Sequence, residues 1–543
     1  MSKPEIGVHN LDHLGIVAGV VDQLGIVEYI NDKLGIHPNE KVSAGVIVKA
    51  MILNGLGFVS APLYMFEKFF VGIPTEHLLG EGVKPEHLND DRLGQVMDDI
   101  DKVGTSDVFL GIALKGVEIF QVEMQAAHLD STSFHLHGEY AQKASIGSEP
   151  EGIEAIEITY GYSRDHRPDL KQFMMNLICV GDGDIPVCLE MASGNQSDKD
   201  KFAKIFTEFK EQWNFDGLCV ADAALYSAGN LQAMTEIKWL TRVPLTLKES
   251  KEVIESNIDL QESKLKGYQI AELTSEYAGI KQRWFMIESA ERKKSDLKRI
   301  EKQIKETRSK AEQSLKKFSG DEFVCEADAL TAATKLSKEL VLHELLDIKV
   351  IEKQHYERPG KPSAKNVPVR TSYQVVAMIV IDEKKISIQK QRAGRFILAT
   401  NVLDSKELSA DDALKEYKAQ QGTERGFRFL KDPLFFASSI FLKTPKRIAV
   451  LGMIMALCLL VYNLAQRQLR KALSEQEETI PNQLGKPTVN PTLRWVFQCF
   501  MAVHLVTIEG VKQIINFTDE RRHILKFFSP ACQSYYLLLE PDP

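Results

Sequence analysis

The chain has 543 residues, of which 44% are hydrophobic and 26% are charged, and its formal net charge is −8. These are globular values, and the length exceeds one ordinary hydrophobic core, so about two to four domains are expected. The acidic balance argues against a generally basic nucleic-acid-binding protein. A local basic surface would still be enough to bind DNA.

Cysteine usage indicates the redox compartment. The seven cysteines are scattered, and no C-x-x-C spacing occurs. This pattern argues against a disulfide framework or a zinc module and favours a reducing cytosol. The first residues, MSKPEIGVHNLDHLG, lack the apolar core of a signal peptide. We therefore expect a cytoplasmic protein.

Residues 1–112 are expected to form an all-α N-terminal domain. NEKVSAGVIVKAMILNGLGFVS has helical apolar spacing, and HLNDDRLGQVMDDIDKVG is typical of a capped amphipathic helix that stops at a glycine. Two roles remain open for this domain: support for the rest of the chain, or DNA-end binding and dimerisation.

Residues 113–244 change to a strand-rich pattern. Strands are predicted in FQVEMQAAHLDSTSFHLHG, AIEITYGYSR and FMMNLICVGDGDIPVCLEMASG, followed by the amphipathic helix DKDKFAKIFTEFKEQW. A short apolar strand then ends at Asp222 and leads into a helix, and KWLTRVPL supplies one more strand. This order of elements predicts an α/β sheet layer.

Residues 245–393 have the pattern of an insertion. GYQIAELTSEYAGIKQRWFMIES predicts a hairpin with Ala-Gly at its turn, and the next 29 residues predict a long helix rich in lysine and arginine. That helix is interpreted as a solvated arm, with contact to DNA phosphates as the alternative. Further strands are predicted in NVPVRTSYQVVAMIVIDEKKISIQKQRA.

Residues 394–475 resume the core with the strand GRFILATNV, and residues 476–543 predict a helical tail. Within this part, residues 448–465 contain no charge and reach the lower length limit of a membrane-spanning helix. A buried core helix fits the segment as well, and no second such segment occurs. We expect no membrane association, and keep a membrane-attached protein as a rival.

Three acidic residues are placed where a sheet could bring them together. Asp130 lies in or just after a strand, Asp222 ends a strand, and Glu424 lies on the helix after the resumed strand. Strand ends and the following helix can converge in an α/β sheet. Three carboxylates there could hold two Mg²⁺ ions, which clamp the attacking and leaving oxygens of a phosphodiester displacement.

The helix YKAQQGTERGFRFLKDP, residues 417–433, carries one unusual face. In a single helix Tyr417, Gln420, Glu424 and Lys431 lie within roughly 60° of arc. HLDST, VADAALYS and this helix together resemble the catalytic triad of bacterial DDE insertion-sequence transposases, in the branch with a Y-x2-R-x3-E-x6-K signature. Gln420 stands where that family has arginine.

The resemblance covers most of the chain, including the helical leader and the large β-containing insertion. It implies an RNase H-like catalytic core interrupted by a β-rich insertion with a helical arm. It also implies DNA transposition, in which Asp130, Asp222 and Glu424 carry two Mg²⁺ ions, with Mn²⁺ as a possible substitute. The implied partners are double-stranded DNA with terminal inverted repeats, target DNA and a second subunit on DNA, in the bacterial nucleoid.

Several residues are candidate DNA contacts. Lys431 would reach a phosphate, and Tyr417 would bind a phosphate or stack on a base. Gln420 can donate a hydrogen bond but cannot neutralise a phosphate, and Arg425 and Arg428 are near enough to compensate.

The candidate functional residues outside that helix each have a second interpretation, in which the residue has no direct functional role. Arg242 is interpreted as a phosphate contact or a surface arginine, and Trp284 as a stacking platform for an extruded base or a packed side chain. His128 with Asp130, and His135 with His137, are alternative transition-metal pairs, although histidines at this strand spacing are common.

Two further functions remain open from the sequence alone. One is a DNA-binding relative of a transposase that has lost activity. Gln420, in the place of the arginine of the family, favours this alternative. The other is an RNase H-like nuclease that cuts DNA without strand transfer.

Overall fold

The computed structural model describes residues 6–36, 38–58, 61–137, 140, 156–163, 166–196, 201–357, 367–432, 442 and 444–539. Chain contacts divide it into two compact units. The first unit comprises residues 1–241, 278–280 and 414–543, and the second comprises residues 242–277 and 281–413. These limits differ from the expected boundaries of the insertion, 245 and 393, because the resumed strand clusters with the second unit.

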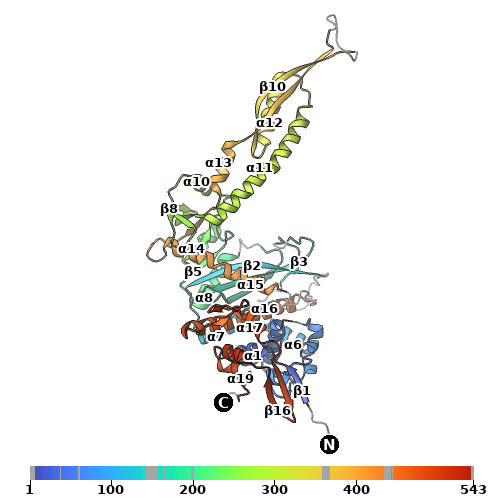
Figure 1. Ribbon diagram of the computed structural model, residues 1–543, viewed down its shortest axis with the longest axis vertical. Coiled ribbons are helices and arrows are strands. Elements are labelled where there is room, and N and C mark those ends of the chain that lie inside the picture. Colours follow the sequence, from blue (N-terminus) through green and yellow to red (C-terminus); the bar gives the residue numbers. More distant parts are fainter. Residues whose placement is uncertain are drawn as a thin grey trace. The chain divides into compact units, whose positions relative to one another are not determined.

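A mixed sheet forms one layer of the first unit, and its strands have the order β4-β3-β2-β5-β6. Figure 1 labels β2, β3 and β5 of this sheet. β2, β3 and β4 pair antiparallel, whereas β2, β5 and β6 run parallel. β2 is buried along nearly its whole length, so both faces of the sheet are covered at this strand. The strands are β2 (Ala126–Leu136), β3 (Lys171–Val180), β4 (Ile185–Ser193), β5 (Leu218–Ala221) and β6 (Trp239–Arg242).

Two helices accompany these strands. α8 (Phe202–Trp213) lies between β4 and β5 in the chain, and α9 (Ala228–Ala233) follows β5. The strand predicted in AIEITYGYSR is reduced, in its described part, to a single bridge between Thr159 and Gln172. Close backbone contacts at Gly161, in this segment, and at Gly194, after β4, hold it as an irregular extended segment.

Helices dominate the first 120 residues, and side-chain caps fix where two of them begin. Ser43 accepts a hydrogen bond from the Val46 N–H, and Asn89 accepts one from the Arg92 N–H. The helices are α1 (Leu14–Gln23), α2 (Ile26–Leu34), α3 (Ala44–Leu56), η1 (Leu63–Met65), α4 (Phe66–Phe69), α5 (Thr75–Leu79), η2 (Pro85–His87), α6 (Asp90–Val103) and α7 (Thr105–Ile119).

The expectation of an all-α N-terminal domain is wrong at its start. β1 (Ile6–Asn10) pairs antiparallel with β15 (His504–Ile508), which pairs in turn with β16 (Val511–Ile515). A five-residue strand whose partner lies almost 500 residues away leaves no local signal in the sequence. The N-terminal and C-terminal parts therefore share one small sheet.

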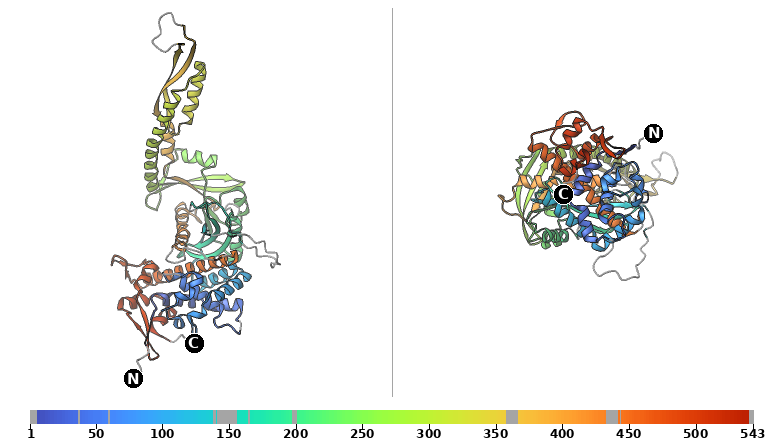
Figure 2. Two further views of the ribbon diagram at one scale, coloured as in Figure 1. Left: turned by 90° about the vertical axis from the view of Figure 1, so that its right-hand side faces the viewer. Right: turned by 90° about the horizontal axis from the view of Figure 1, so that it is seen from below.

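The C-terminal tail is likewise not purely helical. Figure 2 shows its red elements beside the blue N-terminal helices. A Cβ at Gly19 of α1 would lie 2.4 Å from the Cys532 Cα, so the first and last helices touch through their backbones. The remaining elements are β13 (Ile480–Pro481), β14 (Pro487–Thr488), α17 (Leu493–Cys499), α18 (Asp519–Leu525) and α19 (Pro530–Leu537).

The apolar segment forms α16 (Pro445–Glu475), a helix of 31 residues. Among the described residues it is the one single helix long and apolar enough to cross a bilayer, and its apolar window is 100% buried within the protein. α16 packs against α1, α3, α6, α7 and β4. It is the central helix of the first unit's core, as the buried-helix interpretation expects.

The second unit begins with a short helix and a hairpin. β8 and β9 join through Ala278 and Gly279, whose φ values of 57° and 79° suit a type I′ turn and confirm the predicted hairpin. β12 then pairs antiparallel with β9. The elements are α10 (Lys248–Glu255), β7 (Gln261–Glu262), β8 (Tyr268–Tyr277), β9 (Ile280–Ser289) and β12 (Arg395–Thr400).

A helical arm with its own small core continues the second unit (Figure 1). α11 and α12 bury Ala311, Ala329 and Ala333 against one face of the hairpin β10–β11. Residues 383–392 are helical rather than extended, because Asp382 caps this charged segment by accepting the Lys385 N–H. The elements are α11 (Ala290–Phe318), α12 (Glu326–Glu339), β10 (His343–His355), β11 (Arg370–Ile381) and α13 (Glu383–Arg392).

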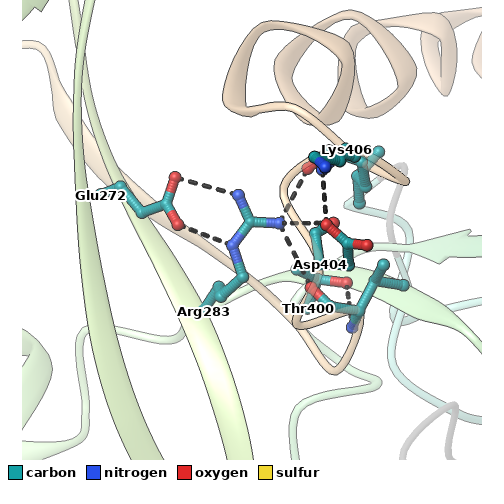
Figure 3. Close-up of polar contacts among 7 residues, drawn as sticks. Glu272, Arg283, Thr400, Asp404 and Lys406 are labelled. Carbon is teal, nitrogen blue, oxygen red and sulfur yellow. Dashed lines mark hydrogen bonds and ion pairs between the residues drawn. The ribbon is translucent and has the colours of Figure 1, made fainter.

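A buried arginine ties the loop after β12 to β9 (Figure 3). Arg283 makes two hydrogen bonds to the Glu272 carboxylate, at 2.7 and 2.9 Å. Its Nη1 donates to the carbonyl oxygens of Val402, at 3.3 Å, and Leu408, at 2.8 Å. Five guanidinium N–H groups in a fixed fork suit this task better than a lysine ammonium would.

Candidate active site

Asp130 and Asp222 are neighbours across two parallel strands. The register pairs His128 with Val220 and Leu129 with Ala221. Carried one residue further, the same register places Asp130 opposite Asp222. Neighbouring strands lie about 4.8 Å apart, and opposed residues project to the same face, so the two carboxylates share one side of the sheet.

Local hydrogen bonds orient both aspartates. Asp130 is 9% exposed, and its Oδ1 accepts the Ser131 N–H at 2.8 Å. The Asp222 Oδ1 accepts the Ala224 N–H at 2.9 Å, which turns the chain after β5. The Asp222 carbonyl oxygen accepts the Thr241 hydroxyl of β6 at 2.6 Å. Asp222 is thus held to the next strand as well as to its own turn.

Glu424 lies on a shorter helix than the sequence predicts. Residues 417–432 do not form one helix, because α14 (Ala410–Ala419) ends and α15 (Gln421–Leu430) begins around Gln420. Tyr417 and Glu424 therefore belong to different helices, and the arc expected for a single straight helix does not apply to that pair.

The buried face of α15 contains two glycines, and it packs on β2, β3 and α16. A Cβ at Gly422 would lie 1.9 Å from the Asp184 Oδ1, and one at Gly426 would lie 3.0 Å from a Leu459 methyl group. Between them, Thr423 donates its hydroxyl to the His128 carbonyl oxygen at 3.4 Å. Thr423 had no predicted role, although the G-T-x-x-G spacing is the signal of a close-packed helix face.

Lys431, at the C-terminal end of α15, also contacts β2. Its Nζ lies over the Phe134 ring, 5.5 Å from the centroid. At 100° per residue, Gln420, Glu424 and Lys431 lie within about 40° of one another around α15. α15 is therefore attached to β2 on both sides of Asp130. Glu424 is exposed.

The basic residues of α15 differ in their surroundings. Arg425 forms an ion pair with Asp184 at 2.8 Å, and the Asp184 carbonyl oxygen accepts the Asn463 amide at 2.7 Å. Arg428 is exposed. Gln420 is only 7% exposed. The structure thus places Gln420 inside, next to the helix break, and not on the surface.

The two predicted contacts in the second unit lie in packed surroundings. The Arg242 guanidinium lies 5.7 Å from the centroid of the Phe396 ring. Trp284 is 2% exposed in β9, and its indole N–H donates to Gln282 at 3.1 Å. For Trp284 this placement favours the packing alternative, because a buried indole offers no face to a base.

The histidines near Asp130 have separate environments. His128 is 2% exposed, and its Nε2 lies 3.6 Å from Glu416 of α14. His135 projects to the opposite face of β2 and contacts the Ser163 hydroxyl at 2.9 Å. Cys179 pairs with His128 in the sheet, and burial raises the pKa of its thiol far above the usual range.

The described part of the chain contains no group of three or more His, Cys, Asp or Glu side chains placed to hold a metal ion. The structure brings Asp130 and Asp222 together on adjacent strands and brings the helix that carries Glu424 onto β2. It does not gather the three carboxylates into one cluster. Two carboxylates still suit Mg²⁺, which is commonly bound by one or two of them together with water and substrate phosphates.

Comparisons with known proteins find similarity to one family model and to solved structures. A family model described as a domain of unknown function (DUF4277) matches residues 6–114, which run from β1 to α7. A solved structure of piggyBac transposase in a synaptic complex with hairpin DNA is similar, with 8% sequence identity and a TM-score of 0.39, over 99% of this chain and 85% of that chain. No curated protein matches the chain. Function therefore has to be inferred from the residues and their geometry.

Proposed function

We propose that the chain is a DNA transposase of the DDE type that cuts the ends of its own element and joins them to target DNA. One observation carries the proposal: Asp130 and Asp222 are neighbours on parallel strands, and the helix bearing Glu424 packs on the same β2 strand. The resemblance of the three sequence motifs indicates the type of reaction. The sheet explains how motifs that are far apart in the chain come close together.

Asp130 and Asp222 are the proposed ligands of Mg²⁺ or Mn²⁺. Glu424, which the structure does not gather into one cluster with them, is the proposed third ligand. Their donor set is made only of carboxylate oxygens, which suits these hard cations. When bound, two such ions would neutralise phosphate charge and make water a better nucleophile. The chain's own contribution is to orient the carboxylates: the turn at Asp222 fixes the chain just after β5, and the Thr423–His128 bond holds α15 on β2.

Lys431 is the proposed phosphate contact on the same face. Its ammonium lies over Phe134, four residues from Asp130 and therefore on the same side of β2. The proposed partners are double-stranded DNA with terminal inverted repeats, target DNA, and a second copy of the chain bound to the same complex. Arg428 remains the exposed candidate for the role of the missing arginine, whereas Arg425 is already paired with Asp184.

The test is cleavage of a labelled element end with Mg²⁺ by Asp130→Asn, Asp222→Asn and Glu424→Gln. These changes keep side-chain shape and remove the charge, so each is expected to lower the cleavage rate on the order of 100-fold or more. Asp216→Asn is the matched control, because Asp216 is highly exposed and pairs only loosely with Lys238 at 3.3 Å. Cleavage that survives in the three active-site variants would refute the proposal.

The DNA products distinguish a transposase from the two alternative functions, a nuclease and an inactive relative. A transposase yields DNA in which the 3′ end of the element is linked to target DNA. A nuclease of similar fold yields cut ends only, and an inactive relative binds the ends without cutting them. The same incubation, with a supercoiled target plasmid added, distinguishes all three.

A further inference from the structure

The segment 156–163, between β2 and β3 in the chain, is fixed against the edge of the sheet. Thr159 and Gln172 exchange two backbone hydrogen bonds, at 3.3 and 2.9 Å. Gln172 is 1% exposed, and its side-chain amide donates to the carbonyl oxygens of Tyr162, at 3.2 Å, and Gly194, at 2.7 Å. The backbone of this segment is therefore held at several consecutive points.

Two glycines make the contact unusually close. A Cβ at Gly161 would lie 1.9 Å from the Gly194 carbonyl oxygen, and one at Gly194 would lie 2.0 Å from the Gln172 carbonyl oxygen. Next to them, the Ser163 hydroxyl accepts the Arg167 N–H at 2.7 Å. Larger residues at the two glycine positions would push the segment away from β3.

This fixed backbone presents two tyrosine rings to solvent. Tyr160 is 57% exposed and Tyr162 is 85% exposed. Tyrosine carries a large aromatic face on only two rotatable bonds, so a rigidly held ring loses little entropy when a flat partner stacks on it.

The pleat of the sheet places Tyr160 on the proposed catalytic face. Thr159 is level with Gln172, so Tyr160, the next residue, projects to the opposite side, the side of Phe173. Phe173 pairs with Phe134 of β2, and their rings are 5.3 Å apart and stacked. Phe134 shares its face with Asp130, so Tyr160 shares that face too, and Tyr162 follows two residues further along the irregular segment.

Two lysines lie between the acids and the tyrosines. Lys431 covers Phe134, and Lys171 pairs with Leu136 at the end of β2, on the same face. From Asp130 to the level of Tyr160 is six residues of strand, about 20 Å. This corresponds to roughly six nucleotide steps of 3.4 Å. Carboxylates, ammonium groups and aromatic rings thus follow one another along one face, in an order that suits a DNA strand.

We infer that Tyr160 and Tyr162 form a stacking platform for unpaired bases of the DNA strand that leaves the proposed active site, with Lys171 and Lys431 contacting its phosphates. The inference rests on the proposed function for the source of the DNA. Base stacking on aromatic side chains tolerates any sequence, because every base has a π face. This would hold an unpaired strand near the site without reading its bases.

The test measures binding of the full chain to a single-stranded 20-residue oligonucleotide of mixed sequence that contains 2-aminopurine. Tyr162→Ala and Tyr160→Ala are each expected to weaken binding roughly 5- to 150-fold and to relieve quenching of the fluorescent base. Tyr162→Phe keeps the ring and should bind as the wild type does. Tyr64→Ala is the matched control, since Tyr64 is 58% exposed on the N-terminal helices.

Three outcomes would overturn the inference. Unchanged affinity in both alanine variants would show that the rings do not stack on bases. An equal loss in Tyr162→Phe would assign the effect to the hydroxyl group. An equal loss for a blunt duplex would assign the surface to paired DNA.

The proposed transposase function and the proposed stacking platform can be refuted independently of each other. The binding assay is repeated with Asp130→Asn protein, in which cleavage is blocked and single-strand binding by the platform is expected to persist. Persistent cleavage in the acid variants would refute the transposase and leave a single-strand binding surface, whereas unchanged binding in the tyrosine variants would refute the platform alone.

Discussion

Gly422 determines how closely α15 approaches the turn between β3 and β4. Its missing side chain makes room for Asp184, which holds Arg425 by an ion pair and Asn463 through its carbonyl oxygen. One small residue therefore sets the position of Glu424, two residues further along the helix. The residue contributes to the proposed site through packing, without touching a substrate.

Gly422→Ala is expected to destabilise the first unit by about 1–3 kcal/mol, because its Cβ would overlap the Asp184 carboxylate. The measurement is the urea midpoint of unfolding. Gly229→Ala is the control, since a Cβ at Gly229 of α9 meets nothing within 4 Å, and alanine favours a helix. Equal midpoints for Gly422→Ala and the wild type would contradict this account.

At the residue scale, the sequence predicts the acids better than the basic contacts. Asp222 is found directly after a strand, because an apolar run that stops at an acid is visible in one dimension, and Asp130 lies within the predicted strand. The pairing of Arg425 with Asp184 is not visible, because it depends on a turn more than 200 residues away. The roles of Gln420, Tyr417 and Arg428 toward DNA stay predictions.

Among the elements, the loop after β12 has the most distinctive anchor. Residues 401–409 form no regular structure, yet Arg283 donates to three of their carbonyl groups, and the Asp404 carboxylate accepts the Lys406 N–H at 2.8 Å (Figure 3). Such a loop leads directly into α14, whose Glu416 faces His128. A side chain in β9 thus fixes the loop from which α14 begins.

Arg283→Met is expected to loosen this loop, because the buried carbonyl groups of Val402 and Leu408 lose their donor at a cost of about 1–3 kcal/mol each. Hydrogen exchange of residues 401–409 should accelerate. Arg308→Met is the matched control: Arg308 pairs with Glu312 on the exposed surface of α11, where an ion pair contributes about 0.3–0.5 kcal/mol. Unchanged exchange in Arg283→Met would show that the loop is held by other contacts.

The elements themselves vary in how far the sequence predicts them. The hairpin β8–β9 and the long helix α11 are confirmed, because Ala-Gly and a charged 3.6-residue period are strong local signals. The break at Gln420 and the helix α13 are not foreseen. In each case a cap or a close packing contact outweighs the local pattern, and both depend on the folded surroundings.

Across the whole first unit, the two ends of the sequence fold together. The imidazole of His13, just before α1, contacts the Leu56 carbonyl oxygen at 2.8 Å and stacks on Phe497 of α17, with ring centroids 4.2 Å apart. Burial lowers the pKa of His13 to about 4. The sequence predicts the helices on either side, but it carries no signal that helix α17 and strand β15 complete them.

Acid is therefore expected to weaken the first unit through His13. The unfolded state binds this proton below its ordinary pKa of about 6.5, whereas the folded state resists protonation until about pH 4. Stability is lost as the pH falls through this window, by about 3 kcal/mol in all. Above pH 6.5 the His13 contribution is fully present.

The measurement compares the wild type with His13→Gln, which does not titrate, from pH 7.5 to pH 4. The difference in unfolding free energy between the two should shrink as the pH falls. His523→Gln, at a half-buried histidine of α18, is the matched control for removal of an imidazole. Parallel curves for the wild type and His13→Gln would refute the assignment.

The pairing of β1 with β15 has a consequence for biosynthesis. A ribosome adds about 5–20 residues per second, so β1 emerges roughly half a minute to two minutes before its partner strand exists. During that interval α1 and α3 also lack their C-terminal neighbours and expose apolar surface. The first unit therefore exposes apolar surface until translation is nearly finished. A first unit cut short by a premature stop would be a substrate for proteases rather than a smaller folded unit.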